Sequence, residues 1–273
     1  GGYIRMTRTN INLSTVWKNL DFQSYQSLAS TNETAKDYLK ENPKSECLIL
    51  TAHQTDGRGR NGRHFYSELD QGLYFSLAIQ LKEKDMMDLT LYTIAAASAM
   101  IQAIEEEFGL KLKVKWVNDL FYHGKKVAGI LTEAITDPKT NKINSLIIGI
   151  GMNLMGEFSK ADESTQKTAG SLFERIPSNF SLETLLSKFL KFFSSYHKNL
   201  QTRNFLPIYE ERLLGRKQKI YYLKKGEKHK AWIQGIDHDG QLLVKNEEGS
   251  IESLISNEIH FSSQQFVKNR EIE

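Results

Sequence analysis

A short segment near residue 60 combines glycine and arginine at a density that a surface turn does not require. Within HQTDGRGRNGRHF, residues 53–65, it holds three glycines and three arginines: Gly57, Gly59, Gly62, Arg58, Arg60 and Arg63. Glycine lets the backbone approach a ligand closely, and the planar guanidinium group binds phosphate or carboxylate oxygens through paired hydrogen bonds. The segment therefore predicts an anion site, such as a nucleotide phosphate site, with a solvated surface turn as the alternative.

Two common phosphate-binding motifs do not describe this glycine loop. The glycines have the GxGxxG spacing of a dinucleotide-binding turn, but that turn must open a helix, and residues 63–66 are expected to lead toward a strand. A Walker loop needs Lys-Ser or Lys-Thr directly after its last glycine, where this chain has Arg63. Because unneutralised arginines repel one another and glycines are costly to order, we expect a loop that is mobile when empty and closes over its anion.

The overall composition is that of a globular protein with little net charge. The 273 residues include 36 Lys and Arg against 33 Asp and Glu, for a net charge of +3. This balance does not by itself favour nucleic acid or an anionic membrane as a partner. The single cysteine, Cys47, lies in an apolar run and predicts a buried thiol in a reducing compartment.

The sequence shows no signal for membrane insertion or export. The first residues lack the apolar segment of a signal peptide, and the apolar stretch 89–104 is too short and too polar to span a bilayer. We therefore expect a cytoplasmic protein with no membrane attachment. Whether Gly1 to Arg5, which precede Met6, are native is left open.

The elements around the glycine loop can be predicted from caps and periodicity. Ser30 and Glu33 have the spacing of a capping box, which predicts a helix beginning at Ser30. The next expected elements are a strand at 46–52, the glycine loop, a strand at 72–81 and a long helix from about Asp88 to a stop at Gly109.

The middle of the chain predicts several strands joined by tight turns. These are 112–116, 120–122, 127–134 and 145–150. Because short turns join neighbouring strands, the pairing should be antiparallel. Ser181 then caps an amphipathic helix, and Pro207 begins a short helix that ends near Gly215. The predicted fold class is α+β, a mainly antiparallel sheet backed by helices.

A second, smaller domain is predicted after Gly215. From Arg216 the chain changes to short alternating segments with turn signals, such as KIYYL and GSIESLI. This pattern is typical of a small β-barrel or SH3-like module. The expected domains are therefore 1–215 and 216–273.

Five motifs, in order and at matching spacing, resemble those of biotin protein ligases. They are Ser30-Thr31-Asn32, Gln54 with the glycine loop, KWVNDL at 115–120, KVAGILTE at 126–133 and GIGMNL at 149–154. The tail, with GIDHDGQLLV and residues 256–259, resembles the C-terminal SH3-like domain of that family. The resemblance implies a catalytic domain similar to those of class II aminoacyl-tRNA synthetases, followed by an SH3-like β-barrel.

The same resemblance implies a two-step, ATP-dependent ligase. The biotin carboxylate would attack the α-phosphate of ATP to give biotinyl-5'-AMP and pyrophosphate. A lysine of a biotin carboxyl carrier protein would then take the biotinyl group. ATP and Mg²⁺ are the implied cofactors, and the sequence does not identify the metal ligands. The basic loop would neutralise the repulsion between the two anionic substrates.

The resemblance also assigns candidate site residues. Those implied to bind biotin are Ser30, Thr31, Asn32, Gln54, Gly57, Arg58, Gly59, Arg60, Lys126 and Gly129. Those implied to bind ATP are Arg60, Arg63, Phe65, Asn118 and Asn153. Those implied to be catalytic are Arg58, Arg60, Lys126 and Asp119.

Structural alternatives accompany several of these roles. Ser30 and Thr31 would also cap a helix, Gln54 could be a polar strand end, and Lys126 one of many surface lysines. Asn118 and Asp119 could form a turn, and Asn153 could cap a strand end. Asp56 stands where the family usually has a small residue, and an ion pair with a neighbouring arginine is the one explanation offered.

Two other functions compete with biotin ligation. One is a lipoate or octanoate ligase or transferase of the same superfamily, and the other is a non-enzymatic module that binds an anion or RNA. The segment before Ser30 is too short for the winged helix-turn-helix of repressor members, so DNA binding is not expected. The carrier protein and homodimerisation stay open.

Overall fold

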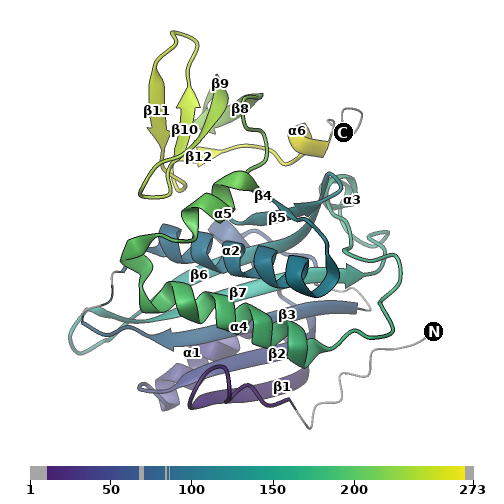
Figure 1. Cartoon of the computed structure of the whole chain (residues 1–273), viewed down its shortest axis with the longest axis vertical. Helices are drawn as coiled ribbons and strands as arrows, with labels where there is room; N and C mark the ends of the chain where they lie inside the picture. Colours follow the sequence, from purple (N-terminus) through teal and green to yellow (C-terminus); the bar gives the residue numbers. More distant parts are fainter. Residues whose placement is uncertain (1–10, 68–70, 84, 86, 268–273) are drawn as a thin grey trace.

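A seven-stranded sheet organises the larger part of the molecule. The computed structural model describes residues 11–67, 71–83, 85 and 87–267. The strand order in this sheet is β1-β2-β3-β7-β6-β5-β4 (Figure 1). The strands are β1 (Leu20–Leu28), β2 (Glu46–Gln54), β3 (Gln71–Gln80), β4 (Lys113–Lys115), β5 (Asp119–Tyr122), β6 (Lys125–Thr136) and β7 (Ile143–Met155).

The sheet is mixed because its first two strands run parallel. β1 pairs with β2 in parallel, whereas the other neighbouring strands are antiparallel. A parallel pair needs a crossover connection, and α1 (Thr31–Glu41) provides it. The sequence predicted α1 and β2 but not β1, whose residues LDFQSYQSL are half-buried or exposed and lack an apolar run. The α+β prediction holds, with a mixed sheet that is mainly antiparallel.

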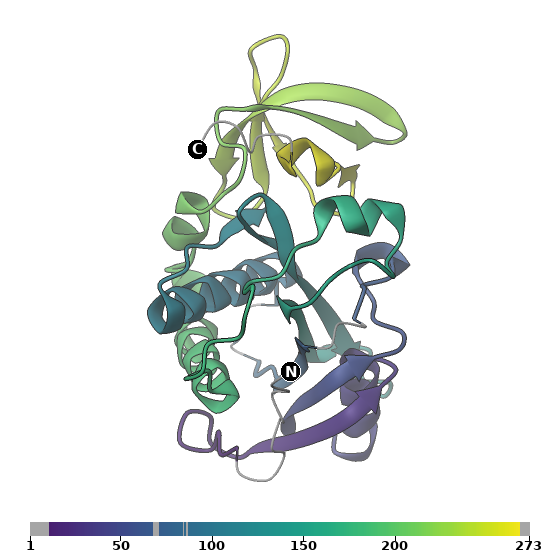
Figure 2. The ribbon, with the colours of Figure 1, turned by 90° about the vertical axis from the view of Figure 1, so that its right-hand side faces the viewer.

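Helices cover both faces of this sheet. α2 (Leu89–Phe108) and α4 (Leu182–Lys198) pack on one face, and α1 lies on the other (Figure 2). The Asp88 side chain accepts a hydrogen bond from the Leu91 amide, and Gly109 ends α2 with a left-handed φ of 69°. α2 is buried around most of its circumference because α4 covers its outer side, so it needs no polar stripe.

The α1 face has a small core of its own. Ala35 and Leu39 of α1 pack with Cys47, Ile49 and other buried residues of the sheet. Burial raises the pKa of the Cys47 thiol to about 12, with the nearby Asp21 adding to the effect. The prediction of a buried thiol is therefore confirmed.

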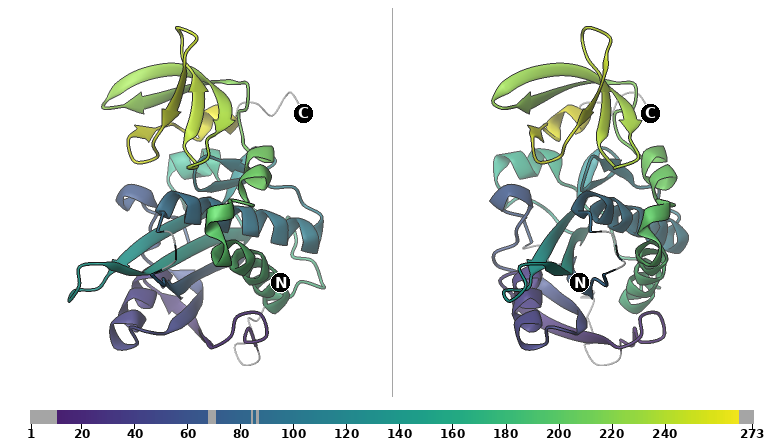
Figure 3. Two further views of the ribbon diagram at one scale, coloured as in Figure 1. Left: turned by 60° about the vertical axis from the view of Figure 1, so that its left-hand side comes forward. Right: turned by 90° about the vertical axis from the view of Figure 1, so that its left-hand side faces the viewer.

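A five-stranded antiparallel sheet lies at one end of the molecule (Figure 3). Its order is β11-β10-β9-β8-β12. The strands are β8 (Lys219–Lys224), β9 (Glu227–Ile236), β10 (Leu242–Lys245), β11 (Ile251–Leu254) and β12 (Ile259–His260). The remaining short helices are α3 (Glu163–Thr168), α5 (Leu206–Glu211) and α6 (Gln264–Val267). The boundary between residues 215 and 216 stays a prediction.

The two sheets meet through an aromatic contact. The Trp116 indole N–H donates to the Gly240 carbonyl oxygen at 2.8 Å, and its ring stacks on Phe261 with centroids 6.3 Å apart. Gly240 has a φ of +77°, and a Cβ there would lie 2.5 Å from Ile94 of α2. Both the turn and the close packing therefore need glycine at this position. Within the described residues, no helix is both long and apolar enough to cross a membrane.

Candidate active site

One pocket collects most of the side chains that the sequence singled out. It lies among the start of α1, the glycine loop, strands β5 to β7 and the β12 end of the smaller sheet. Thirteen of the predicted site residues line it: Ser30, Thr31, Asn32, Gln54, Arg58, Gly59, Arg60, Arg63, Phe65, Asn118, Asp119, Lys126 and Gly129. Gly57 and Asn153 are not part of the lining.

The pocket has a neutral polar end at the start of α1. Ser30 caps the helix, because its Oγ accepts from the Glu33 amide at 3.4 Å. The Thr31 amide and hydroxyl both donate to Gln54 Oε1, at 2.9 and 3.2 Å. Ser76 Oγ lies 2.7 Å from Thr31 Oγ1 and 2.5 Å from Asn32 Oδ1. These short side chains form a connected, buried network suited to a neutral ligand that offers N–H and C=O groups.

The glycine loop is a compact folded turn. The Gly59 amide donates to the Arg63 carbonyl at 2.6 Å, and the Phe65 amide donates to the Gly57 carbonyl at 2.8 Å. A Cβ on Gly57 would lie 2.4 Å from Ser67 Oγ, so this position accepts only glycine without rearrangement. Gly57 therefore lets the loop pack tightly against Ser67 and Phe65, and it does not line the pocket.

The three arginines of the loop have different environments. Arg58 is half-exposed and pairs with Asp56 at 3.0 Å and with Glu33 at 3.7 Å. The hydrogen bond to Asp56 is the main reason that the Arg58 pKa is raised. The sequence left Asp56 with one explanation, an ion pair with a neighbouring arginine, and the structure contains that pair.

The other two arginines reach the smaller sheet. An Arg60 guanidinium N–H donates to the Ser256 carbonyl at 2.7 Å, and burial lowers the Arg60 pKa. Arg63 lies 2.8 Å from His260 Nδ1. Since a guanidinium group can only donate, His260 must accept at that nitrogen. Arg60 and Arg63 therefore connect the loop to the second sheet beside the pocket.

A cluster of charge lies on the strand side of the pocket. Lys126 Nζ is 2.9 Å from Asp119, and Lys115 Nζ is 3.7 Å from the same carboxylate. Burial raises the Asp119 pKa, but the charges of Lys126 and Lys115 outweigh burial and hold it below its ordinary value. Burial also lowers the Lys115 pKa to about 8, against the attraction of Asp119. With Arg60 and Arg63 nearby, the cluster carries excess positive charge that an anionic ligand would neutralise.

An aromatic ring closes the pocket against two glycines. A Cβ on Gly151 would lie 2.6 Å from the Phe65 ring, and one on Gly129 would lie 3.1 Å from it. Lys126 Nζ lies over the same ring, 5.5 Å from its centroid. Gly129 of β6 and Gly151 of β7 therefore leave room for the flat Phe65 ring beside these two strands.

Two predicted asparagines have structural partners. The Asn118 amide donates to the Ile130 carbonyl at 2.9 Å and so joins the β4–β5 turn to β6. Asn153 donates to the Gly170 carbonyl at 3.2 Å, and its buried Oδ1 has no hydrogen-bond partner among the described residues. Asn118 lines the pocket while Asn153 does not, so their assigned roles toward ATP stay predictions.

Several lining residues were not predicted from the sequence. They include Lys115 and Trp116 of the KWVNDL motif, together with Ser256, Ile259, His260 and Phe261 from the β11–β12 turn, β12 and the residue after it. Lys115 adjoins the predicted pair Asn118 and Asp119, so the motif itself was a usable signal. The residues of the smaller sheet are distant in sequence, and no local pattern indicated their approach.

Asp119 is the one carboxylate among the lining residues of the described chain. Within that part of the chain, no group of three or more His, Cys, Asp or Glu side chains could hold a metal ion by itself. Mg²⁺ is commonly held by one or two carboxylates together with substrate phosphates. A single buried carboxylate beside an anion pocket fits that mode of binding, in which substrate phosphates and waters would supply the other ligands.

Comparison with known proteins identifies the two parts of the chain separately. Residues 24–153 match the biotin/lipoate A/B protein ligase family, and residues 223–262 match the biotin protein ligase C-terminal domain. The bifunctional ligase/repressor BirA of Bacillus subtilis is 29% identical over 81% of this chain and 68% of its own length. The biotin–[acetyl-CoA-carboxylase] ligase of Paracoccus denitrificans is 27% identical over 81% of this chain and 94% of its own length.

The fold comparison agrees with the sequence comparison. The biotin protein ligase of Aquifex aeolicus, in complex with biotin and ATP, superposes with a TM-score of 0.71 at 27% identity. The alignment covers 89% of this chain and 99% of that one. Both the catalytic-domain match and the C-terminal-domain match therefore lie on one continuous fold. The chain belongs to the biotin protein ligase family.

Proposed function

We propose that this chain activates biotin with ATP and transfers the biotinyl group to a lysine of a biotin carboxyl carrier protein. The observation that carries the proposal is one pocket with a neutral polar end at Thr31 and Asn32 and a cationic end at Lys126 and Arg60. Biotin has the matching polarity, with a neutral ureido ring at one end and a carboxylate at the other. Its carboxylate would therefore lie where ATP phosphates can also be held.

The first step joins two anions. A biotin carboxylate oxygen attacks the α-phosphorus of ATP, the α–β phosphoanhydride bond breaks, and pyrophosphate leaves. Lys126 and Arg60 would neutralise the repulsion between carboxylate and phosphate and the charge that develops at phosphorus. Mg²⁺, when bound, would add positive charge at the phosphates, and Asp119, the one carboxylate among the described lining residues, would help to hold it.

In the second step, the carrier lysine amine attacks the acyl carbon of biotinyl-5'-AMP. The acyl–phosphate bond breaks, AMP leaves, and the amine loses a proton as the amide forms. Asp119, held ionised by Lys126 and Lys115, could orient the incoming ammonium group. The glycine loop would meanwhile keep water from the reactive anhydride.

The remaining site roles are proposals from the same resemblance. Ser30, Thr31 and Asn32 are assigned to the ureido ring, Gln54 to a hydrogen bond with biotin, and Phe65 to stacking on adenine. Gly129 is assigned to close approach of the β6 backbone to biotin.

Finer features of the fold, location and partners belong to the proposal as well. We assign the larger sheet to the fold of class II aminoacyl-tRNA synthetases and the smaller sheet to an SH3-like barrel. A cytoplasmic location and the absence of DNA binding remain predictions of the sequence, and homodimerisation stays open. The family matched by residues 24–153 includes lipoate ligases as well. The second match, of residues 223–262 to the biotin protein ligase C-terminal domain, favours biotin.

A transfer assay tests this function directly. The protein is incubated with ATP, a biotin carboxyl carrier domain and either biotin or lipoate, and the carrier is analysed by mass spectrometry. We expect a single biotinyl adduct on one lysine and no lipoyl adduct. A lipoyl adduct formed at the same rate, or no adduct with either acid, would overturn the proposal.

A further inference from the structure

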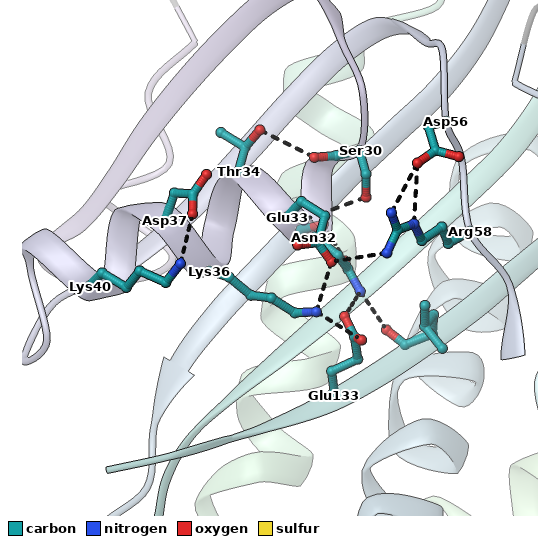
Figure 4. Close-up of polar contacts among 12 residues, drawn as sticks. Ser30, Asn32, Glu33, Thr34, Lys36, Asp37, Lys40, Asp56, Arg58 and Glu133 are labelled. Atoms are coloured by element: carbon teal, nitrogen blue, oxygen red, sulfur yellow. Dashed lines mark hydrogen bonds and ion pairs between the residues drawn. The ribbon is translucent and has the colours of Figure 1, made fainter. Parts of the chain in front are cut away.

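A second group of charges lies behind the neutral end of the pocket. Glu133 of β6 and Lys36 of α1 form an ion pair at 3.0 Å, and Lys36 also pairs with Glu33 at 2.8 Å (Figure 4). All three side chains are partly buried. Burial by itself would lower the Lys36 pKa, but the hydrogen bonds to Glu33 and Glu133 leave it raised. Lys36 therefore stays protonated and holds the Glu133 carboxylate in place.

Glu133 in turn fixes the amide of Asn32. The Asn32 Nδ2 group donates to Glu133 Oε2 at 3.0 Å and approaches the Leu131 carbonyl at 3.4 Å. Both partners are acceptors only, so the NH₂ side of the amide must face them. If the amide were reversed, its oxygen would lie against a carboxylate and a carbonyl oxygen. One orientation of Asn32 is therefore strongly favoured.

This orientation decides what Asn32 presents to the pocket. Its Oδ1 lies on the other side, where it accepts from Ser76 Oγ at 2.5 Å and keeps a second lone pair, and a Cβ on Gly149 would lie 2.2 Å from that oxygen. Asn32 and Gly149 both line the pocket, whereas Lys36 and Glu133 do not. An acceptor oxygen at this point recognises a ligand N–H. A reversed amide would place its NH₂ group, which is a donor, at this point and would repel that N–H.

We propose that Glu133, held by Lys36, is a positioning residue that orients the Asn32 amide so that its oxygen accepts from a ring N–H of the substrate. This inference rests on the proposed function and adds to it two residues that do not touch the ligand. If so, the affinity for the ureido ring depends on the Glu133–Lys36 ion pair, whereas the affinity for ATP does not. The ligand class it selects is a cyclic urea with a free N–H.

The main variant is Glu133→Ala, assayed by biotin-dependent pyrophosphate exchange. The biotin KM should rise about tenfold, the change expected for a weakened polar contact in a buried site. The kcat at saturating biotin and the KM for ATP should each change less than twofold. The preference for biotin over an analogue methylated on a ureido nitrogen should shrink by a similar factor. Without Glu133, the Asn32 amide can turn, so its oxygen no longer faces the ligand in every molecule.

A double-mutant cycle separates positioning from general packing. In an Asn32→Ala background, Glu133→Ala should add less than a twofold increase in biotin KM, because the amide it orients is gone. Glu133→Gln keeps a carbonyl acceptor for Asn32 Nδ2 and should restore most of the discrimination against the methylated analogue. Effects of Glu133→Ala that are additive with Asn32→Ala, or that raise the KM for ATP equally, would overturn the proposal.

A matched control lies on the same helix. Asp37 pairs with Lys40 at 3.2 Å on the exposed side of α1, so Asp37→Ala removes a similar ion pair away from Asn32 and should leave the biotin KM unchanged.

If Glu133→Ala does not fold, Glu133→Gln and Lys36→Met carry the test, with Lys36→Met expected to raise the biotin KM. Wild-type protein that shows no exchange with biotin refutes the proposed function. Active wild type with a Glu133 variant indistinguishable from the Asp37 control refutes this inference alone.

Discussion

Neighbouring residues of the same type have different tasks in this site. Arg58 is half-exposed and pairs with acids of its own loop and of α1. Arg60, two positions further on, is partly buried and bonds to the backbone of the smaller sheet. The sequence predicted an anion site from the number of arginines, but their separate partners depend on the fold of the loop.

We expect Arg60→Ala to weaken retention of biotinyl-5'-AMP. A charge-assisted hydrogen bond in a desolvated site contributes about 1.5–3 kcal/mol, so the dissociation rate of the adenylate should rise by roughly 10- to 100-fold. Stopped-flow release of the preformed adenylate measures this rate. Arg175→Ala, a change outside the pocket lining, is the control. An unchanged release rate for Arg60→Ala would remove this arginine from the phosphate site.

Lys115 should make ATP binding sensitive to alkaline pH. Burial lowers its pKa to about 8, so the empty protein loses a positive charge in the pocket as the pH rises through that value. ATP affinity should therefore fall between about pH 7 and pH 9, as calorimetry would measure. Lys115→Arg keeps its charge throughout this range and should flatten the profile. An equally steep profile in the arginine variant would assign the pH effect to another group.

At the scale of elements, caps and apolar periodicity were the reliable signals. Asp88, Gly109 and Ser181 bound α2 and α4 as predicted. β1 was missed because an edge strand that is half-exposed carries no apolar run. Its parallel pairing with β2 therefore also went unpredicted, since parallel pairing depends on a crossover that no local pattern records.

The contact between α2 and α4 predicts a pH-dependent stability. His197 of α4 stacks on Phe193 and lies 2.8 Å from the Tyr92 hydroxyl of α2, and burial lowers its pKa below the ordinary 6.5. As pH falls below about 6.5, the unfolded chain takes up a proton before the folded one does. The stability contributed by neutral His197 is therefore complete above that pH and declines until the lowered folded pKa is passed.

Denaturant unfolding at pH 7.5 and pH 5.5 tests this effect. We expect His197→Gln to lose less free energy of unfolding between the two values than the wild type does. His238→Gln, at an exposed position, should keep the wild-type difference. The same pH dependence in wild type and His197→Gln would show that other groups cause it.

At the scale of the whole molecule, the pocket is completed by two sheets that are distant in sequence. The motifs predicted most residues of the larger sheet that line it. Ser256, His260 and Phe261 were missed as lining residues because their approach depends on how the smaller sheet docks. Conversely, Gly57 and Asn153 were predicted as binding residues but lie outside the lining. A motif records which residues are required, but not whether each one contacts the ligand or supports a neighbour.

We expect Trp116→Phe to destabilise the junction between the sheets. The change keeps an aromatic ring for Phe261 but removes the hydrogen bond to the Gly240 carbonyl, which is then left buried without its donor. The free energy of unfolding should fall by about 1–3 kcal/mol, measured by chemical denaturation. Trp232→Phe, on β9 and half-buried, serves as the control and should change it by about 0.5 kcal/mol or less. Equal effects of the two changes would contradict a specific role for Trp116.

The central claim is that one pocket brings a biotin carboxylate and ATP together for adenylation. Isotope exchange between labelled pyrophosphate and ATP tests this step without any carrier protein. We predict exchange that requires biotin and is absent with octanoate, with lipoate and without any acid. Exchange that proceeds without biotin, or equally well with lipoate, would contradict the account.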